Sequence, residues 1–183
     1  MNYSKINYYD IANGPGVRVS LFVSGCRRHC PGCFNKVTWD FGAGRPFTME
    51  TEDAILEALG SEYVSGLSLL GGDPFEPENT EALLPFLARV RNAYPEKTIW
   101  CWTGFVLEEL KSPKAMEMLG MVDCLVDGPF VLEEKQLGLK WRGSRNQRVI
   151  LLKKNTEGIL SIPKDWDYKK ELATVLEEKY GLK

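Results

Sequence analysis

The stretch VRVSLFVSGCRRHCPGC, residues 17–33, carries an apolar, β-branched run directly into a loop with three cysteines. Cys26, Cys30 and Cys33 have the spacing C-x3-C-x2-C. A cubane iron–sulfur cluster normally takes four thiolates, and a structural zinc site also closes with four protein ligands. A loop with only three thiolates therefore leaves one coordination position open, and open positions are where metal sites do chemistry.

The composition is that of an ordinary globular chain of one domain. Its 183 residues are 44% hydrophobic and 26% charged, which is enough to bury a core. The net charge of −2 gives no general attraction to nucleic acid or anionic lipid, so we expect neither as a partner. The first ten residues lack a signal-peptide core, and no run approaches the ~20 apolar residues of a membrane span. We therefore expect a cytoplasmic protein.

The cysteines are typical of metal ligands rather than of disulfide partners. Their total of five is odd, and three lie within eight positions, a clustering that in cytosolic proteins indicates metal binding or catalysis. Cys101 and Cys124 lie in apolar, strand-like runs, so we expect buried structural thiols there. His29 directly precedes Cys30, and adjacent residues rarely bind one metal together. A zinc module with three cysteines and this histidine stays open, because zinc accepts that ligand set.

Strand-like and helix-like segments alternate along the chain. Strands are expected at residues 17–23, 67–70, 98–102, 121–126 and 147–152. Helices are expected at residues 51–59 and 80–94, from an N-cap at Ser112 to a terminator at Gly120, and in the tail at 165–180. Pro85 falls within the second helix, which therefore either starts late or bends there.

This alternation predicts an α/β fold in which a parallel sheet is covered by helices. A closed eight-stranded barrel takes ~250 residues, so the chain forms either an open partial barrel or a doubly wound sheet. In both architectures the active site lies at the carboxyl ends of the strands. The loops expected there are the cysteine loop, GGDPF (71–75), WTGF (102–105) and VDGPF (126–130).

The cysteine loop after the first strand, with GGDP after a later one, resembles the radical S-adenosylmethionine (SAM) superfamily. Within it, NGPGVRVSLFVSGC, CPGCFNKVTW, GGDPF, WTGF, VDGPF and WRGSRNQ closely resemble activating proteins of anaerobic (class III) ribonucleotide reductases. The similarity runs in order from about residue 10 to 148. It implies one radical SAM domain over 1–183, with mostly parallel strands in an open partial (β/α) barrel, a core at about 10–152 and a helical tail at about 165–181.

The resemblance also implies the chemistry. Cys26, Cys30 and Cys33 would hold three irons of one [4Fe-4S] cluster, and SAM would chelate the fourth. One electron from the reduced cluster would cleave SAM to methionine and a 5′-deoxyadenosyl radical, which would take a hydrogen atom from a glycine of the large reductase subunit. A low-potential electron donor such as flavodoxin would be needed. Because cluster and SAM carry this chemistry, no side chain is assigned as a catalytic residue.

Eight further residues are expected to contact the cofactors. Gly72 is the strongest candidate outside the cysteine loop, because glycine at a strand end lets the backbone approach a ligand closely. Superfamily members contact the amino group of SAM with this loop. Phe34 is a candidate for the adenine, since Gly32 stands where many members carry an aromatic residue. The same glycine-rich loops are also strong turn sequences. The full set is Gly32, Phe34, Asn35, Gly71, Gly72, Val126, Asp127 and Gly128.

Other readings of the chain stay open. The protein could activate another glycyl radical enzyme, such as pyruvate formate-lyase, although activases of that type generally have longer chains. It could also be a non-catalytic iron–sulfur or zinc module, although iron–sulfur carriers usually have four cysteines. We expect Asp73 and Pro74 to shape their loop rather than to touch a ligand. The group Trp141, Arg142, Arg145 and Arg148 either docks a partner or forms an ordinary solvated basic face.

Overall fold

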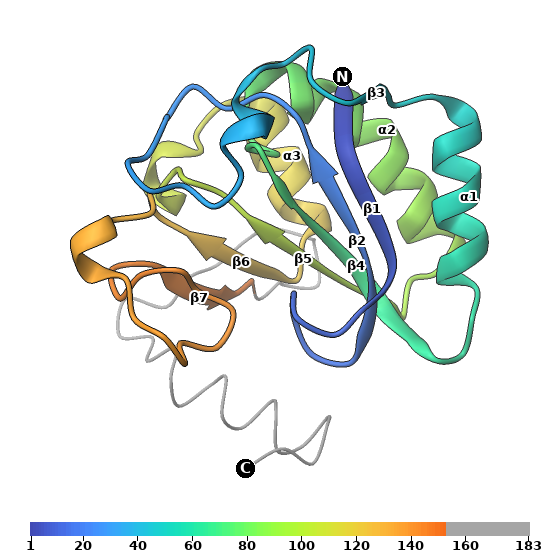
Figure 1. Ribbon diagram of the computed structural model, residues 1–183. Coiled ribbons are helices and arrows are strands. Elements are labelled where there is room, and N and C mark those ends of the chain that lie inside the picture. The colour runs from blue at the N-terminus through green and yellow to red at the C-terminus, as the bar shows by residue number, and fades with distance from the viewer. Residues whose placement is uncertain (153–183) are drawn as a thin grey trace.

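One open sheet of seven strands, in the order β3-β1-β2-β4-β5-β6-β7, organises the described part of the chain. The computed structural model describes residues 1–152 (Figure 1). The strands are β1 (Asn2–Asp10), β2 (Val17–Val23), β3 (Arg45–Pro46), β4 (Val64–Gly71), β5 (Thr98–Trp102), β6 (Cys124–Asp127) and β7 (Arg148–Leu151). The helices are α1 (Met49–Leu59), α2 (Pro77–Ala93) and α3 (Pro113–Met121), with short 3-10 turns η1 (Lys36–Trp39), η2 (Leu107–Glu109) and η3 (Leu132–Glu134).

The four central strands, β2, β4, β5 and β6, run parallel to one another, as the strand–helix alternation predicts. Antiparallel strands extend both sides of this parallel centre, with β1 and β3 at one edge and β7 at the other. The predicted α/β class is confirmed. Strand β1 was not expected, because its sequence has no apolar run, and Asp10 is its only buried residue.

The predicted bounds hold for two of the five expected strands and differ for the other three. Residues 17–23 and 98–102 are strands as predicted, whereas β4 is longer at both ends. The expected strand at 121–126 begins only at Cys124, because Met121 is still helical and Gly120 does not end α3. Strand β7 is one residue shorter at each end than expected.

The first two helices begin earlier than the sequence suggested. Helix α1 starts at Met49 and ends at Leu59 as expected, with Gly60 as its C-cap. Helix α2 starts at Pro77, so the idea of a late start is wrong. Pro77 at the first helical position needs no hydrogen-bond partner, which suits it to a helix start, and Pro85 lies inside the helix. The predicted helix at 165–180 lies outside the described residues.

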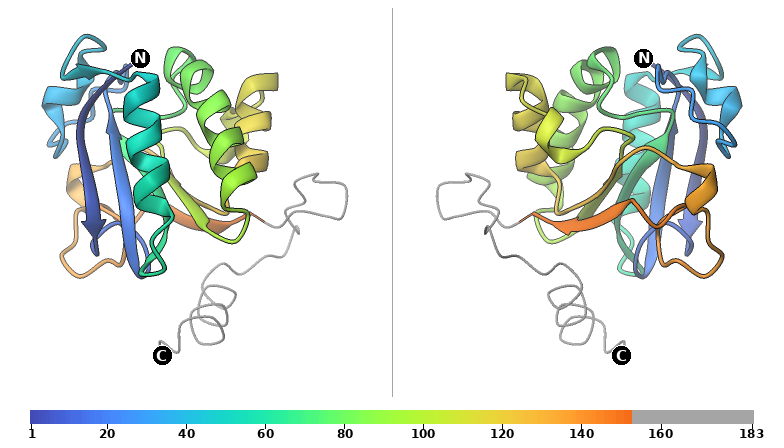
Figure 2. Two further views of the ribbon diagram at one scale, coloured as in Figure 1. Left: turned by 90° about the vertical axis from the view of Figure 1, so that its right-hand side faces the viewer. Right: turned by 90° about the vertical axis from the view of Figure 1, so that its left-hand side faces the viewer.

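The two faces of the sheet are covered differently. Helices α1, α2 and α3 of the described residues lie on one face (Figure 2), where Val19, Leu21 and Val23 of β2 join the main apolar core. Side chains alternate along a strand, so Arg18, Ser20 and Phe22 point to the other face. The fully buried helix residues in the core are Ile55, Leu59, Leu83, Phe86, Leu87, Val90, Met118 and Leu119.

Residues 128–147, drawn in orange in Figure 1, cross the face opposite to α1, α2 and α3. Trp141 of this segment packs edge-on against Trp100, with 4.8 Å between the ring centroids. Its backbone oxygen accepts a hydrogen bond of 2.7 Å from Nε1 of Trp102. Two tryptophans of β5 therefore hold the segment above the sheet. A hollow remains between the segment and the sheet. Within residues 1–152, no helix has both the length and the apolar character needed to cross a bilayer.

The core assignment predicts the effect of truncating Phe86, which is fully buried and packs edge-on against Phe47 at 5.3 Å. Phe86→Ala should lower the free energy of unfolding by about 3–5 kcal/mol, because it removes apolar contacts and leaves a cavity. Met116→Ala is the control, since that side chain is 47% exposed, and it should change stability by less than about 0.5 kcal/mol. Urea unfolding of the metal-free protein measures both, and equal losses would contradict the assigned core.

Candidate functional site

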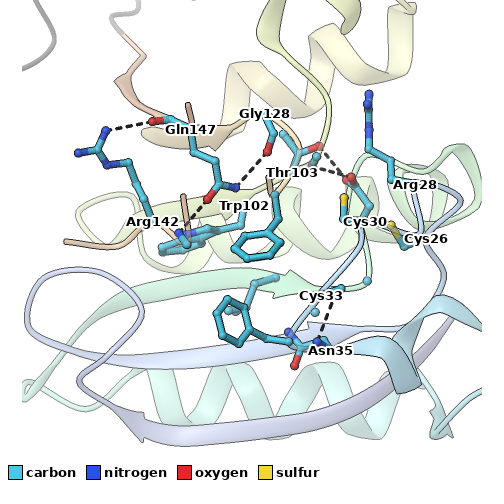
Figure 3. Close-up of a pocket in the computed structure, with 18 of the residues that line it drawn as sticks. Cys26, Arg28, Cys30, Cys33, Asn35, Trp102, Thr103, Gly128, Arg142 and Gln147 are labelled. Carbon is cyan, nitrogen blue, oxygen red and sulfur yellow. Dashed lines mark hydrogen bonds between the residues drawn. The ribbon is translucent and has the colours of Figure 1, made fainter. Parts of the chain in front are cut away.

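A pocket of about 440 Å³ lies at the carboxyl ends of the parallel strands, where the sequence places the site. Its walls come from the cysteine loop, the GGDP loop, the turn after β5 and the segment 128–147 (Figure 3). Phe22, Leu70 and Trp102 line it from the sheet, and Ala12 and Asn13 line it from the loop between β1 and β2. This volume is within the range of pockets that take small molecules and cofactors.

Cys26, Cys30 and Cys33 all line this pocket as half-buried free thiols. Three soft sulfur ligands in one cavity are the donor set of an iron–sulfur cluster, so the residues fit that group. Among the described residues, no three His, Cys, Asp or Glu side chains are arranged to hold one metal ion. The two observations are compatible, because in a cubane each thiolate binds a different iron.

The remaining thiols and the histidine lie elsewhere. Cys101 and Cys124 are fully buried on β5 and β6 and do not line the pocket, which confirms them as buried thiols. Burial raises the pKa of both well above its usual value. His29 stacks on Trp39 with 4.5 Å between the ring centroids and is also absent from the pocket wall.

Backbone hydrogen bonds hold the cysteine loop in place. The amide of Gly25 donates to the backbone oxygen of Thr38 at 2.8 Å, and the amide of Cys26 donates to the backbone oxygen of Trp39 at 3.1 Å. The amide of Asn35 donates to Sγ of Cys33 at 3.4 Å. Burial raises the pKa of the Cys26 thiol to about 11, although nearby backbone N–H groups act in the opposite direction. Since only the thiolate is a metal ligand, metal binding at Cys26 must release a proton.

The two glycines of the GGDP loop lie so close to neighbouring backbone that neither position has room for a side chain. The amide of Gly72 donates to the oxygen of Val23 at 2.7 Å, and that of Asp73 donates to the oxygen of Gly25 at 2.8 Å. A Cβ atom on Gly72 would lie 2.5 Å from the oxygen of Gly25. Gly71 has φ of 111°, a conformation that L side chains rarely adopt. The structure therefore requires both glycines, and both line the pocket.

Asp73 joins the GGDP loop to the turn after β5. Its carboxylate is buried and accepts hydrogen bonds of 2.8 Å from the hydroxyl of Thr103 and from the amide of Gly104. The amide of Phe75 donates to it at 3.0 Å. Burial raises the pKa of Asp73 to about 6, while these donors lower it. Asp73 therefore shapes its loop as expected, and it also borders the pocket.

Five of the eight expected cofactor contacts share the pocket wall with the cysteines. They are Phe34, Asn35, Gly71, Gly72 and Gly128. The ring of Phe34 is 66% exposed and lies edge-on to Phe130 at 5.3 Å, so an aromatic pair borders the pocket beside Cys33.

The structure places the other three residues beside the pocket rather than in its wall. Gly32, with φ of 73°, lies so close to Leu132 that a Cβ atom there would come within 2.8 Å of a methyl group. Val126 is buried in a small apolar cluster that also contains Trp100 and is separate from the main core. Asp127 is fully buried and accepts hydrogen bonds from the amide of Leu107 at 2.8 Å and from Nε of Arg148 at 2.9 Å.

The basic group near the end of the described chain divides into different roles. Trp141 and Arg142 line the pocket, and Arg145 is exposed. Arg148 pairs with both Asp127 and Glu108, which raises the pKa of its guanidinium and lowers that of Glu108. Arg148 of β7 thus forms ion pairs with β6 and with η2.

Among the polar residues of the pocket wall that sequence reasoning missed are Arg28 and Gln147. The guanidinium of Arg28 lies 4.2 Å from the centroid of the Phe105 ring and donates to Glu109 at 2.6 Å. Gln147 accepts from the amide of Gly143 at 2.8 Å and donates to the oxygen of Gly128 at 3.0 Å. Both residues stand in the quoted strings, but nothing in the strings distinguishes them from ordinary surface residues.

Comparison with known proteins gives this geometry a context. The family described as a 4Fe-4S single cluster domain matches residues 12–150. An anaerobic ribonucleoside-triphosphate reductase-activating protein of Escherichia coli is 46% identical over 151 residues, which cover 81% of this chain and 97% of the relative. The chain belongs to the family of anaerobic ribonucleoside-triphosphate reductase-activating proteins.

Other members of this activating-protein family match to the same extent. Those of Vibrio cholerae and Pasteurella multocida are each 46% identical, over 149 and 152 residues, which are 80% of this chain and 96% and 95% of the relatives. The matched 4Fe-4S domain includes all three cysteines of the pocket. An iron–sulfur cluster is thus the metal group that both the family and the donor set support.

The donor set predicts which cysteines the activating protein needs for its cluster. Cys26→Ala, Cys30→Ala and Cys33→Ala should each lose the intact four-iron cluster, because the pocket then offers only two thiolates. Cys101→Ala and Cys124→Ala should keep it and change only stability. Iron and sulfide analysis after anaerobic reconstitution measures this, and a requirement for Cys101 or Cys124 would contradict the three-ligand site.

Proposed function

We propose that this protein is a radical SAM activase that generates a glycyl radical on anaerobic ribonucleotide reductase. Cys26, Cys30 and Cys33 would hold three irons of one [4Fe-4S] cluster, and SAM would occupy the remainder of the pocket. When bound, the cluster and SAM would supply reductive cleavage to a 5′-deoxyadenosyl radical, which takes a hydrogen atom from a glycine of the large reductase subunit. The observation that carries the proposal is the meeting of three thiols and the GGDP loop in one pocket.

The chain's own part in this reaction is binding, orientation and exclusion of water. Gly71 and Gly72 expose backbone where a side chain would block the approach to the cysteine loop. Phe34, Phe130 and Trp102 give apolar and aromatic surface suited to an adenine or to a dry reaction space. The open side of the sheet is consistent with the partial (β/α) barrel of the radical SAM type.

The partners follow from the same proposal. The name of the relatives points to the anaerobic reductase as target, and an extended glycine loop of its large subunit would have to reach the pocket. A low-potential donor such as flavodoxin would supply the electron, and all of these reactions would take place in the cytoplasm. The relatives are named for reductase activation, so this target is favoured over pyruvate formate-lyase and over a non-catalytic module.

An anaerobic assay tests the proposal. The reconstituted protein is reduced with dithionite and given SAM, with and without the large subunit of an anaerobic reductase. We expect 5′-deoxyadenosine in the assay and, with the subunit, the electron paramagnetic resonance (EPR) doublet of a glycyl radical. Cleavage without the doublet would move the target to another substrate. Zinc binding with neither cluster nor cleavage would reduce the protein to a structural module.

The contact at Gly72 gives a second test. Gly72→Ala places a methyl group 2.5 Å from the oxygen of Gly25 and should push the two loops apart. Because displacements near 1 Å can cost on the order of 10²-fold in a reaction, SAM cleavage should fall by about that factor. In Gly120→Ala the new Cβ meets nothing within 4 Å, so this control should cleave SAM normally. Equal rates in the two variants would show that close approach at Gly72 is not required.

A further inference from the structure

The side chain of Asn79 bridges the two loops that form the core of the pocket, yet it does not line the pocket itself. Asn79 is the third residue of α2 and is fully buried. Its Nδ2 atom lies 3.0 Å from the oxygen of Ser24 and 3.3 Å from that of Gly25, both on the cysteine loop. The same atom donates to the oxygen of Asp73 on the GGDP loop at 2.9 Å.

Asn79 acts here as a hydrogen-bond donor only. Its Oδ1 atom is buried and has no hydrogen-bond partner among the described residues. A buried oxygen without a hydrogen-bond partner is unfavourable, so Oδ1 does not stabilise the fold. The stabilising bonds of the Asn79 side chain are those of its two N–H groups. Those groups face three carbonyl oxygens from two loops. A side chain without donors at this place would leave the carbonyls facing one another.

Glu76 holds the other side of the first cysteine. It is the N-cap residue of α2, and its buried carboxylate accepts 2.7 Å and 2.6 Å hydrogen bonds from the backbone amide and the guanidinium of Arg27. Asn79 bonds the two residues before Cys26, and Glu76 bonds the one after it. The first turn of α2 therefore holds Cys26 from both sides, while the segment leading into that turn is the GGDP loop.

We propose that Asn79 is a positioning residue that sets Cys26, a ligand of the cluster, relative to Gly72 at the SAM site. This inference rests on the proposed function and assigns Asn79 no contact with SAM or iron. Cleavage of SAM requires the cluster and SAM to be held in one fixed arrangement, and the rate of such a reaction is sensitive to small displacements. The hydrogen bonds of Asn79 run to both loops, so their loss shifts one loop against the other.

Asn79→Asp is the sharpest variant, because it keeps the shape and replaces the donor with an oxygen facing three carbonyl oxygens. Thr80→Val is the matched control. Thr80 is the next residue and is also buried. Within residues 1–152, its hydroxyl donates only to the oxygen of Pro74, at 3.2 Å, so it makes no bond to the cysteine loop. Both variants remove hydrogen bonding from the same turn of α2, and only the first removes the bridge.

The first measurement uses the metal-free protein. Amide hydrogen exchange at Gly72 and Asp73, whose N–H groups bond the segment leading to Cys26, should be at least about tenfold faster in Asn79→Asp, since local opening is easier. Thr80→Val should exchange there like the wild type. Asn79→Ser, which is shorter and cannot bridge both loops, serves if the aspartate variant does not fold, and it should show the same increase.

The second measurement uses the reconstituted protein. Asn79→Asp or Asn79→Ser should keep its iron and sulfide, while the SAM dissociation constant rises about tenfold or more and the change that SAM makes in the cluster EPR spectrum is reduced. Exchange and SAM affinity like those of Thr80→Val would overturn the role of Asn79 alone. A wild-type protein that holds a cluster but binds no SAM would instead overturn the proposed function, and the role of Asn79 in it.

Discussion

The pocket depends on a backbone-to-backbone contact between two loops that are far apart in sequence. The amides of Gly72 and Asp73 donate to the oxygens of Val23 and Gly25, and the contact leaves no space for a Cβ atom on Gly72. Parallel pairing of β2 with β4 brings the ends of these strands together, so the contact is a direct result of the sheet topology. The cysteine loop therefore lies beside the GGDP loop.

Further contacts extend this arrangement around the pocket. Asp73 joins the GGDP loop to Thr103 and Gly104 after β5, and Gln147 bonds Gly128, which holds the two ends of the segment 128–147 together. The carboxylate of Asp73 and the side-chain amide of Gln147 are hydrogen-bonded within the protein, which favours a fixed shape for these parts of the pocket wall. Such a wall suits a reaction in which the bound groups supply the chemistry and the protein supplies orientation.

Much of this could be predicted from sequence because it lies in local patterns. The alternation of strand-like and helix-like segments indicated an α/β sheet. The cysteine spacing and the turn sequences that follow the strands indicated a site at the strand ends. Strand β1 was missed because it lacks an apolar run and depends on pairing with β2. The bridging role of Asn79 could not be predicted either, since it requires contacts with Ser24 and Asp73 that only the folded chain provides.

In the proposed function, three thiols hold the cluster and leave one iron for SAM. Electron–nuclear double resonance on the reduced cluster, with SAM labelled with ¹⁵N at its amino group, is the decisive measurement. We expect a ¹⁵N coupling strong enough to show the amino group bound to iron. A fully formed cluster that shows no such coupling with SAM present would overturn the proposed SAM site.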